Sequence, residues 1–576
     1  MHVKRMHQRV ALATVAATLV FGVTAAADVG SGSGPPTAVG TGGAAASVER
    51  LATQTAVDIL RRGGNAVDAA VASAAVLGVT EPFSCGIGGG GFMVVRTAGG
   101  SVTTIDGRET APAAMHPTSF WENGAPLPFN SARYSGLSVG VPGTVETWEE
   151  ALEKFGTMSL KEVLAPAIHV ARHGYVIDQV WFDQVQANSD WFDDIPASAA
   201  LFLDADGTPR DVGTVFTNPE LAATYERIAH LGAKGFYRGK VADALVETVQ
   251  DPPVGPTANH VWRPGVITMR DLHIYTAPER APTHVSYRGL DVWSMGPPSS
   301  GGSTVGEALN ILEGYDLASM PREEAQHYFL EASRYAFADR NAYLADPDYF
   351  DVPLSGLLSE EYAASRRALI TTTAAPGAVP PGDPYPYEGA ETTTHLTTSD
   401  TAGNVVSYTF TIESTGGAGL VVPGHGFLLN NELTDFNFDS TTHPNRVEGG
   451  KRPRSSMAPT IVTKAGAPFL ALGSPGGATI ITTVLQLLVE RVDLGLTLPQ
   501  AIAAPRASQR NGATTGAEPA FLATPERTAL EARDHRFTNA GEIGAAAAIE
   551  FLPGGGVLAA AEPVRRGGGS AMTERP

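Results

Sequence analysis

A proline-rich stretch that runs into a threonine cluster is the feature that most constrains this chain. Residues 371–387 have the sequence TTTAAPGAVPPGDPYPY, which cannot form regular helix or sheet and predicts an extended, exposed loop. The cluster TTTH follows at residues 392–395, and beyond it the pattern changes to period two. A chain that cuts itself needs such a loop, because the two new ends must be free to separate. We therefore interpret the bond between Thr392 and Thr393 as a self-cleavage site, with an ordinary linker as the alternative.

A threonine at a new chain start has a chemistry that an internal threonine lacks. Its hydroxyl is a weak nucleophile until a base removes the proton. A terminal threonine carries such a base in its own α-amine, whose pKa of about 8 leaves part of it neutral at pH 7. Before cleavage this nitrogen belongs to an amide and cannot act as a base. Cleavage before Thr393 would therefore switch on a nucleophile.

The composition excludes several classes of protein. With 576 residues, 43% of them hydrophobic and 17% charged, the chain can bury a large core. The net charge of −20 and the absence of a basic stripe argue against nucleic-acid binding. The single cysteine, Cys85, excludes an intrachain disulfide, and we expect it to be a small buried residue rather than a nucleophile. The histidines show no metal-ligand spacing, so we expect no metal and no cofactor.

The N-terminal segment has the features of a secretory signal. Lys4, Arg5 and Arg9 precede an uncharged run rich in Val and Ala, and small residues before Asp28 suit cleavage. An uncleaved membrane anchor is the alternative, but so much alanine and glycine makes a poor lipid-facing surface. We expect residues 1–27 to be removed, residues 28–46 to form a flexible linker, and the mature protein to be exported, periplasmic or extracellular.

The rest of the chain predicts a mixed α and β fold. We expect one helix to begin after an N-cap at Ser47 and a second to span residues 65–78. A third should begin at the capping box of Ser159 and Glu162. Beyond the threonine cluster the pattern predicts a β-hairpin over residues 395–412, strands at residues 426–431, 458–463 and 467–473, and a buried helix at residues 478–492. Strands together with long buried helices indicate stacked β-sheets covered by helices.

Two motifs match known patterns without the required context. Residues 86–91, GIGGGG, fit GxGxxG, but a helix precedes them and a strand follows, the reverse of a dinucleotide site. We interpret these glycines as close backbone packing beside a site.

Residues 136–140, GLSVG, fit GxSxG and make Ser138 a candidate nucleophile. Pro142 and Gly143 interrupt the strand–turn–helix that this motif needs, which favours a structural turn.

Several separated motifs give this chain a family resemblance. From about Ala45 to near the C-terminus it contains RRGGNAVDAAVA, EPFSCGIGGGGFMV, DGRETAP, VPGTV, GPPSSGG, TTHLT, LLNNELTDF, KRPRSSMAPT and GSPGG. In these motifs it resembles the γ-glutamyltranspeptidases of the N-terminal nucleophile hydrolase superfamily. The resemblance implies an α+β fold, a four-layer αββα sandwich in which a large and a small subunit from one precursor intertwine. It places the cut before the Thr of T-x-H, here Thr393, so that residues 47–392 and 393–576 form the two subunits.

The resemblance also implies an activity. Thr393 would attack the carbonyl of a γ-glutamyl amide such as glutathione, and the γ-glutamyl-enzyme would pass its acyl group to water or to the amine of an amino acid or peptide. Gly476 and Gly477 would donate their N–H groups to the oxyanion, and Thr411 would hydrogen-bond the nucleophile hydroxyl.

The same resemblance assigns the groups that recognise the substrate. Arg108 would hold the α-carboxylate of the γ-glutamyl group bidentately. Hydroxyl donors would come from Ser455 and Ser456. The α-ammonium would be held by Glu413, Glu432 and Asp435.

The chain departs from the family pattern in two respects. Glu413 and Glu432 stand where other members have amides, and their charge favours an ammonium more strongly. Only about twenty residues separate Asp435 from Ser455, fewer than in members with a lid, which predicts an open cleft.

Three rival functions remain. A glutaryl-cephalosporin acylase of the same superfamily is the nearest rival, but its substrate lacks the amine that Asp435 would bind. A serine hydrolase using Ser138 and an exported solute-binding protein would both leave the chain uncut.

Overall fold

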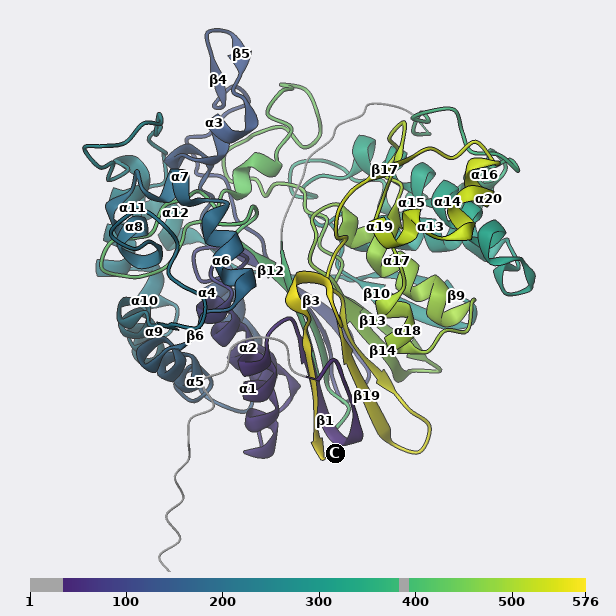
Figure 1. The fold of residues 1–576 in the computed structure, drawn as a ribbon, viewed down its shortest axis with the longest axis horizontal. Coiled ribbons are helices and arrows are strands. Elements are labelled where there is room, and N and C mark those ends of the chain that lie inside the picture. Colours follow the sequence, from purple (N-terminus) through teal and green to yellow (C-terminus); the bar gives the residue numbers. More distant parts are fainter. Residues whose placement is uncertain (1–34, 383–392, 576) are drawn as a thin grey trace, which may run out of the picture.

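The computed structural model of the chain describes residues 35–382 and 393–575 (Figure 1). The expected signal at residues 1–27, the start of the expected linker, part of the proline-rich loop and Thr392 lie outside the described residues. No helix within the two described ranges combines the length and the apolar character that crossing a bilayer requires.

Strands from the whole length of the chain form one sheet. Within the described residues thirteen strands are joined in the order β8-β3-β2-β12-β11-β1-β19-β18-β14-β13-β10-β9, with β20 also paired to β1. These strands are β1 (Thr37–Ser47), β2 (Gly90–Arg96), β3 (Val102–Gly107), β8 (Glu279–Arg280), β9 (Thr283–Tyr287), β10 (Leu290–Ser294), β11 (Thr394–Ser399), β12 (Val405–Thr411), β13 (Thr460–Lys464), β14 (Ala467–Gly473), β18 (Ala547–Phe551), β19 (Gly556–Ala561) and β20 (Ser570–Arg575).

The sheet folds back on itself into two packed layers. β11 and β12 contact β14 and β18, which are not their neighbours in the hydrogen-bonding order. Helices α1, α2 and α4 contact the layer that contains β11 and β12, whereas α13, α17 and α18 contact the other layer. In Figure 1 the strands lie in the middle with helices on both sides. The predicted α+β, four-layer αββα architecture is confirmed.

The helices range from single turns to six turns. The longer ones are α1 (Arg50–Arg61), α2 (Ala66–Thr80), α4 (Thr144–Phe155), α5 (Leu160–His173), α9 (Pro219–Leu231), α11 (Lys240–Gln250), α13 (Gly301–Glu313), α14 (Arg322–Tyr343) and α17 (Thr479–Val492). Shorter ones include α6 (Gln179–Gln186), α8 (Pro196–Phe202), α16 (Glu360–Arg367), α18 (Leu498–Ala503) and α20 (Pro525–Glu531). A small separate sheet is formed by β15 (Ala507–Ser508), β16 (Thr515–Ala517) and β17 (Phe537–Asn539).

Strands from before and after Thr393 are interleaved in groups in the large sheet. β2 pairs with β12, β10 pairs with β13, and β1 pairs with β11, β19 and β20. The two largest apolar clusters also draw their side chains from both parts of the chain. Neither part can complete its sheet or its core alone. The predicted intertwining is confirmed.

The flexible linker predicted at residues 28–46 is wrong over its second part. Thr37–Ser47 is the strand β1, and its last five residues are buried. A Cβ added to Gly43 would lie 2.6 Å from the carbonyl oxygen of Ser399, on the neighbouring strand β11. The small residues that are typical of a linker in the sequence are therefore what lets β1 pack closely between other strands.

Most other element predictions are confirmed. α2, the capping box of Ser159 and Glu162, and the hairpin of β11 and β12 form as expected. The first helix begins at Arg50 with Glu49 as its N-cap, because β1 continues to Ser47, the expected cap.

The strand predicted at residues 426–431 does not form. Within the described residues this segment makes only an isolated bridge, between Val421 and Leu428. Gly424 and Gly426 have φ angles of +72° and +69°, which interrupt the extended conformation of a strand. The segment is a loop, and it carries two asparagines into the site described below.

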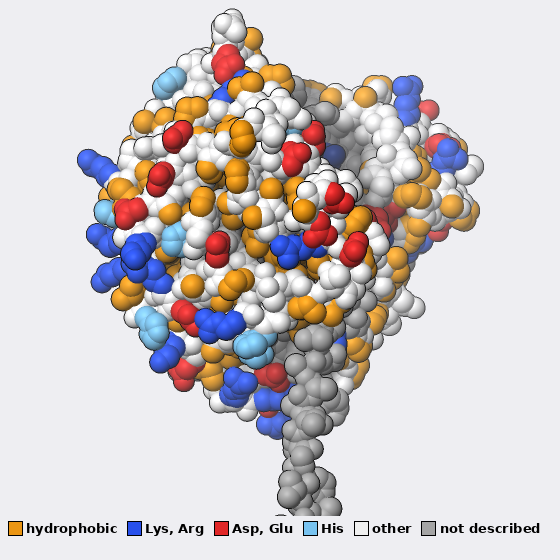
Figure 2. All heavy atoms as spheres, turned by 60° about the vertical axis from the view of Figure 1, so that its left-hand side comes forward, with side chains coloured by type: hydrophobic (Ala, Val, Ile, Leu, Met, Phe, Trp, Pro, Cys, Tyr) orange, Lys and Arg blue, Asp and Glu red, His pale blue; other side chains and the backbone are white. Residues whose placement is uncertain are grey.

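The surface agrees with the acidic composition. On the face shown in Figure 2, Lys and Arg side chains are scattered among Asp and Glu rather than gathered into a continuous basic band.

Ala45→Glu tests the central position of β1. Ala45 is 2% exposed and pairs with Thr398 and Met572 on the flanking strands. A carboxylate there cannot reach water, so we expect a loss of about 3 kcal/mol or more in the free energy of unfolding. Val39→Glu adds the same charge to the same strand at a side chain that is 61% exposed, and should cost less than about 0.5 kcal/mol. Thermal unfolding measures both, and equal losses would contradict an integral β1.

Candidate active site

Thr393 lies at the start of a buried hairpin. β11 and β12 pair with Thr394 opposite Phe410, which brings Thr411 opposite Thr393 one residue further along. Thr393 is 2% exposed, and its carbonyl oxygen accepts a 2.8 Å hydrogen bond from Nη1 of Arg566. The predicted nucleophile is therefore fixed by a strand. Arg566 was not predicted, since nothing near the C-terminus of the sequence links it to Thr393.

A small pocket brings most of the predicted residues together. Its own side chains fill it so closely that no water molecule fits between them, and every wall except Met457 was a predicted site residue. The walls are Arg108, Thr393, Thr411, Glu413, Glu432, Asp435, Ser455 and Met457. They come from the end of β3, from the hairpin, and from the loops on either side of residues 436–454, so distant parts of the chain converge here.

An arginine and two carboxylates pair inside this pocket. Arg108 is 1% exposed and forms ion pairs with Glu432 and Asp435. It also donates to the carbonyl oxygens of Pro453 and Arg454, at 3.1 Å each. The sequence analysis assigned Arg108 and the acids to opposite ends of a ligand, whereas here they neutralise one another. A zwitterionic ligand would have to exchange these ion pairs for its own.

The third acid, Glu413, is held in a strained backbone conformation. Its φ angle is +76°, and its carboxylate accepts hydrogen bonds from Ser414 Oγ and Asn431 Nδ2. Its N–H donates to Thr411 Oγ1 at 2.8 Å. The residue opposite Thr393 is therefore hydrogen-bonded to the backbone of Glu413. Ser414 and Asn431 were not predicted, although Asn431 belongs to the motif LLNNELTDF.

Glu109 is a fourth acid that sequence reasoning missed. It is fully buried next to Arg108 in the chain, and burial raises the pKa of its carboxyl to about 8, against the attraction of Arg108. The carboxyl is therefore mostly protonated at pH 7 and adds little charge to the site. The motif DGRETAP gives no sign of this, because burial depends on the folded surroundings.

Asn430 connects the loops around the pocket. Its Nδ2 donates to the carbonyl oxygens of Gly88 at 2.7 Å and Gly140 at 3.0 Å, and its Oδ1 accepts from the Gly140 N–H at 2.9 Å. A Cβ added to Gly88 would lie 2.0 Å from the carbonyl oxygen of Leu428. The prediction that residues 86–91 pack their backbone closely beside the site is confirmed.

His395 is a spacer between two strands rather than a base. Its Nδ1 and Nε2 each lie 2.9 Å from a hydroxyl, that of Thr409 and that of Thr397. Burial lowers the pKa of the imidazole to about 3, so the ring is neutral. A Cβ added to Gly473, the last residue of β14, would lie 2.4 Å from this ring. The end of β14 therefore packs directly on the strand that follows Thr393.

Gly476 and Gly477 lie in the turn that leads from β14 into α17. They are not walls of the pocket, but their φ angles are +128° and +58°. Neither N–H donates to an acceptor within residues 35–382 or 393–575, although both carbonyls accept hydrogen bonds from the start of α17. Two such donors at a helix start suit a developing oxyanion. Their role in catalysis stays a prediction.

The two predicted serines take different positions. Ser455 lines the pocket and pairs through its backbone with Ser299. Ser456 Oγ instead accepts a hydrogen bond from Nη2 of Arg340 and is not a wall of the pocket. Of this pair, only Ser455 is placed to meet a ligand bound beside Thr393.

The alternative nucleophile, Ser138, belongs to a structural turn. It lies in a 3-10 turn, Gly136–Ser138, and its hydroxyl donates to the carbonyl oxygens of Arg133 at 2.6 Å and Ser135 at 3.0 Å. A hydrolase serine has to be exposed at a strand-to-helix turn, so the serine-hydrolase alternative is wrong.

Cys85 is buried as expected, and burial raises the pKa of its thiol.

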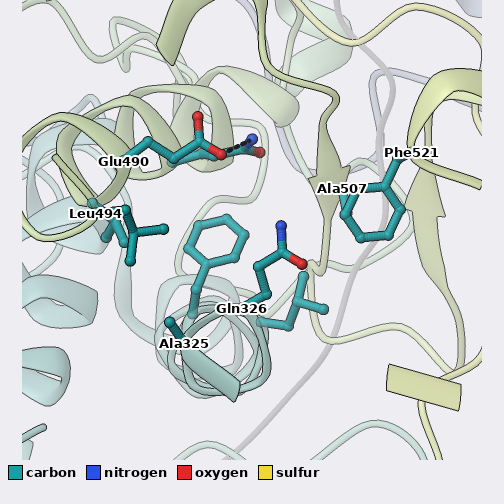
Figure 3. Close-up of a pocket in the computed structure, with 10 residues that line it drawn as sticks. Ala325, Gln326, Glu490, Leu494, Ala507 and Phe521 are labelled. Atoms are coloured by element: carbon teal, nitrogen blue, oxygen red, sulfur yellow. Dashed lines mark hydrogen bonds between the residues drawn. The ribbon is translucent and has the colours of Figure 1, made fainter. Parts of the chain in front are cut away.

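A second cavity lies between α14 and α17 (Figure 3). Its walls include Ala325, Gln326, Glu490, Leu494, Ala507 and Phe521, and it shares none of them with the pocket of Thr393. Its volume of about 20 Å³ is enough for one water molecule and too small for a substrate.

Comparison with known proteins gives one consistent family. A family model described as Gamma-glutamyltranspeptidase matches residues 52–572. The chain is 40% identical over 489 residues to the glutathione hydrolase proenzyme of Bacillus subtilis, with 81% of both chains covered. It is 36% identical over 540 residues to the acylase ACY 1 proenzyme of a Pseudomonas species, with 91% of this chain and 92% of the relative covered.

Two solved structures show the same fold. A cephalosporin acylase from Bacillus halodurans superposes with a TM-score of 0.82 at 30% identity, covering 94% of this chain and 97% of that one. A γ-glutamyltranspeptidase from Helicobacter pylori superposes with a TM-score of 0.54 at 35% identity, covering 59% of this chain and 95% of that one. The fold is therefore shared with both γ-glutamyl and cephalosporin-cleaving enzymes.

Gly473→Ala tests the contact that sets the spacing of the site. The added Cβ would meet the His395 ring at 2.4 Å, and we expect overpacking to cost about 1–3 kcal/mol in the free energy of unfolding. Gly356→Ala is the control, because nothing lies within 4 Å of its added Cβ. The double variant with His395→Ala should lose less than the sum of the two single losses. Strictly additive losses in thermal unfolding would contradict the contact.

Proposed function

The chain belongs to the γ-glutamyltranspeptidase family, and on that premise we propose that it cuts itself before Thr393 and then transfers γ-glutamyl groups to water or amines. One observation carries the substrate class: Thr393 shares its pocket with one guanidinium and three carboxylates. This set complements the α-carboxylate and α-ammonium of a γ-glutamyl group. Glutathione is the donor that the names of the relatives support.

Maturation begins, in this proposal, with attack of the Thr393 hydroxyl on the carbonyl carbon of Thr392. The peptide C–N bond breaks, an ester to Thr393 forms, and water hydrolyses that ester to free the α-amine. Arg566 supports this step by holding the Thr393 carbonyl oxygen. Relatives that are named proenzymes support a precursor of this kind.

Turnover then uses the new α-amine as the base. It takes the proton of the Thr393 hydroxyl, and the oxygen attacks the γ-carbonyl of the donor. Gly476 and Gly477 stabilise the oxyanion, and Thr411, opposite the nucleophile, orients its hydroxyl. His395 is not the base in this mechanism, because its lowered pKa of about 3 makes the ring a weak proton acceptor and both its ring nitrogens already face hydroxyls.

Donor binding exchanges ion pairs instead of burying new charge. The α-carboxylate of the donor forms an ion pair with Arg108 in place of Glu432 and Asp435. The α-ammonium of the donor then forms ion pairs with these two acids. Every buried charge keeps a partner throughout, which avoids the cost of an unpaired ion in a dry pocket. Ser455 adds a hydroxyl donor to the bound carboxylate, and Glu413 adds a third acid for the ammonium.

Glutaryl-cephalosporin hydrolysis is the second candidate, which the similarity to acylases supports. A glutaryl group would bring a carboxylate to Arg108 but no ammonium to the acids that it displaces. Glu432 and Asp435 would then lose their ion pairs with Arg108 and gain no ammonium in exchange, which is unfavourable for buried carboxylates. The pocket therefore favours the γ-glutamyl group.

The partners and location follow from the same proposal. Acceptors are amino acids, peptides and water, and the large and small subunits from one precursor stay together through their shared sheet. The basic and apolar start of the sequence supports export.

Thr393→Ala should leave an uncut, inactive precursor. The wild-type chain should give two bands on a denaturing gel, and N-terminal sequencing of the smaller should begin at Thr393. Thr394→Ala is the matched control for register, because the Thr394 hydroxyl has no hydrogen-bond partner within the described residues. It should still be cut and active. Cleavage that survives Thr393→Ala and fails in Thr394→Ala would contradict the assignment.

Asp435→Asn should weaken recognition of the α-ammonium. We expect kcat/KM for γ-glutamyl-p-nitroanilide to fall by roughly tenfold to a hundredfold, the worth of one charge-assisted hydrogen bond. The rate on glutaryl-p-nitroanilide, which has no ammonium, should not fall. The wild-type enzyme should cleave the γ-glutamyl anilide faster than the glutaryl anilide. The opposite order would contradict the γ-glutamyl assignment and support glutaryl-cephalosporin hydrolysis.

A further inference from the structure

The segment that follows Glu413 has a cationic partner with no part in the mechanism above. This partner is Arg133, the last residue of the short helix α3 (Phe129–Arg133). Its Nε donates to the carbonyl oxygen of Gly417 at 3.2 Å, and its Nη2 donates to the carbonyl oxygen of Thr415. One guanidinium therefore holds two carbonyl groups of the backbone that leads away from Glu413.

Arg133 is itself held in place by its neighbours. Its guanidinium lies over the ring of Tyr134, with 4.3 Å between Cζ and the ring centroid, and its Nη2 also donates to Oδ1 of Asn188 at 3.1 Å. The Tyr134 hydroxyl donates to the same oxygen at 3.0 Å, and Asn188 Nδ2 donates to the carbonyl oxygen of Gln184 in α6 at 2.8 Å. A planar fork fixed in this way can direct its N–H groups at two carbonyls at once, which a single ammonium cannot do as well.

The segment held by Arg133 needs outside contacts to keep its conformation. Glu413 has a φ angle of +76°, and a residue with a side chain persists in that region only where its surroundings hold it there. Gly416 and Gly417 follow with φ angles of +88° and +57°, and two glycines in succession leave the free backbone many other conformations. The direction of the Glu413 side chain therefore depends on groups that fix the backbone beyond it.

Arg133 and Glu413 also interact through their charges. Glu413 is 1% exposed, and two of the groups that donate to its carboxylate, Ser414 Oγ and Asn431 Nδ2, are neutral. Burial lowers the pKa of Arg133, and the charges of Tyr134 and Glu413 oppose that lowering. The guanidinium and the carboxylate are thus close enough to attract each other. A cation beside a buried carboxylate offsets part of the cost of removing that charge from water.

We propose that Arg133 is a positioning residue for the α-ammonium of the donor, which acts through Glu413 and makes the enzyme select γ-glutamyl over glutaryl groups. This rests on the proposed function, in which Glu413 adds a third acid for that ammonium. Arg133 is not a wall of the pocket, so its effect on the donor is indirect. It keeps residues 413–417 in one arrangement before the donor arrives. The carboxylate then needs little ordering when it binds the ammonium, and that preorganisation strengthens binding.

Arg133→Gln tests this role with two donors that differ only in the amino group, γ-glutamyl-p-nitroanilide and glutaryl-p-nitroanilide. We expect the kcat/KM ratio of the first donor to the second to fall by about tenfold. For the γ-glutamyl donor the loss should lie in KM, because the ammonium does not take part in the bond changes. Both rates come from one sample, so a smaller fraction of active enzyme cancels from the ratio. Arg133→Lys keeps the charge without the fork and should give an intermediate fall.

A double variant separates positioning from a general structural role. Glu413→Gln should lower the donor ratio by itself. Arg133→Gln added to Glu413→Gln should lower the ratio no further, because Arg133 acts through that carboxylate. A double variant whose ratio falls by the product of the two single effects would overturn the proposal, and so would equal losses on both donors in Arg133→Gln.

Arg263→Gln is the matched control. Arg263 holds the same helix by another contact, since its Nη1 donates to the carbonyl oxygen of Ser131 in α3 at 3.1 Å, and it forms an ion pair with Glu122. Its donor ratio should equal that of the wild type. An unchanged ratio in Arg133→Gln, or the same fall in Arg263→Gln, would also overturn the proposal. A wild-type enzyme that does not cleave the γ-glutamyl anilide would instead overturn the proposed function, so the two failures are distinct.

Discussion

The contact between Gly473 and the ring of His395 fixes the spacing on which the site depends. Thr393 directly precedes β11 in one sheet layer, and Gly476 and Gly477 follow β14 in the other. The distance between the proposed nucleophile and the proposed oxyanion donors therefore depends on how closely β14 packs on β11. Only a glycine leaves room for the imidazole, whose two nitrogens face Thr397 and Thr409. Because burial keeps the ring neutral, it fills the interface without bringing in a charge. The histidine of T-x-H thus spaces the two strands, and in the proposed mechanism the base is the α-amine at the new chain start.

Cutting a chain in its middle is compatible with this fold because the cut lies at the edge of a hairpin and not between domains. β1, from the start of the described chain, is hydrogen-bonded to three strands that follow Thr393. Losing one peptide bond therefore removes no strand pairing and little of the apolar core. It frees the one nitrogen that the chemistry needs, while rigid strands keep the neighbouring atoms in place.

Sequence reasoning succeeded where function depends on residues close together in the chain, and failed where it depends on their surroundings. The hairpin, the glycine run and seven walls of the pocket were predicted from motifs and periodicity. β1 was not, because glycine and alanine look the same in a linker and in a closely packed strand. Arg566 acts across the fold, and no local pattern marks it; Asn430 lies within the motif LLNNELTDF, but the motif does not show that its side chain joins the loops of Gly88 and Gly140. The pairing of Arg108 with Glu432 and Asp435 was also missed, because motif matching assigns residues to a ligand and does not show what they contact without one.

In the proposed mechanism, the acids of the pocket explain why an ammonium, more than a carboxylate, decides what binds. If all four acids near Arg108 were ionised, one guanidinium would face four negative charges. Burial keeps Glu109 mostly protonated, which leaves Glu413, Glu432 and Asp435 against Arg108. Among the pocket walls Arg108 is the cation, and it forms ion pairs with Glu432 and Asp435. A ligand that brings only a carboxylate would take Arg108 from these acids and offer them no cation in return, whereas a zwitterion pairs its carboxylate with Arg108 and offers a cation to the acids. In the proposed mechanism, selection for the amino group therefore follows from this exchange of ion pairs, even before any shape of the ligand is considered.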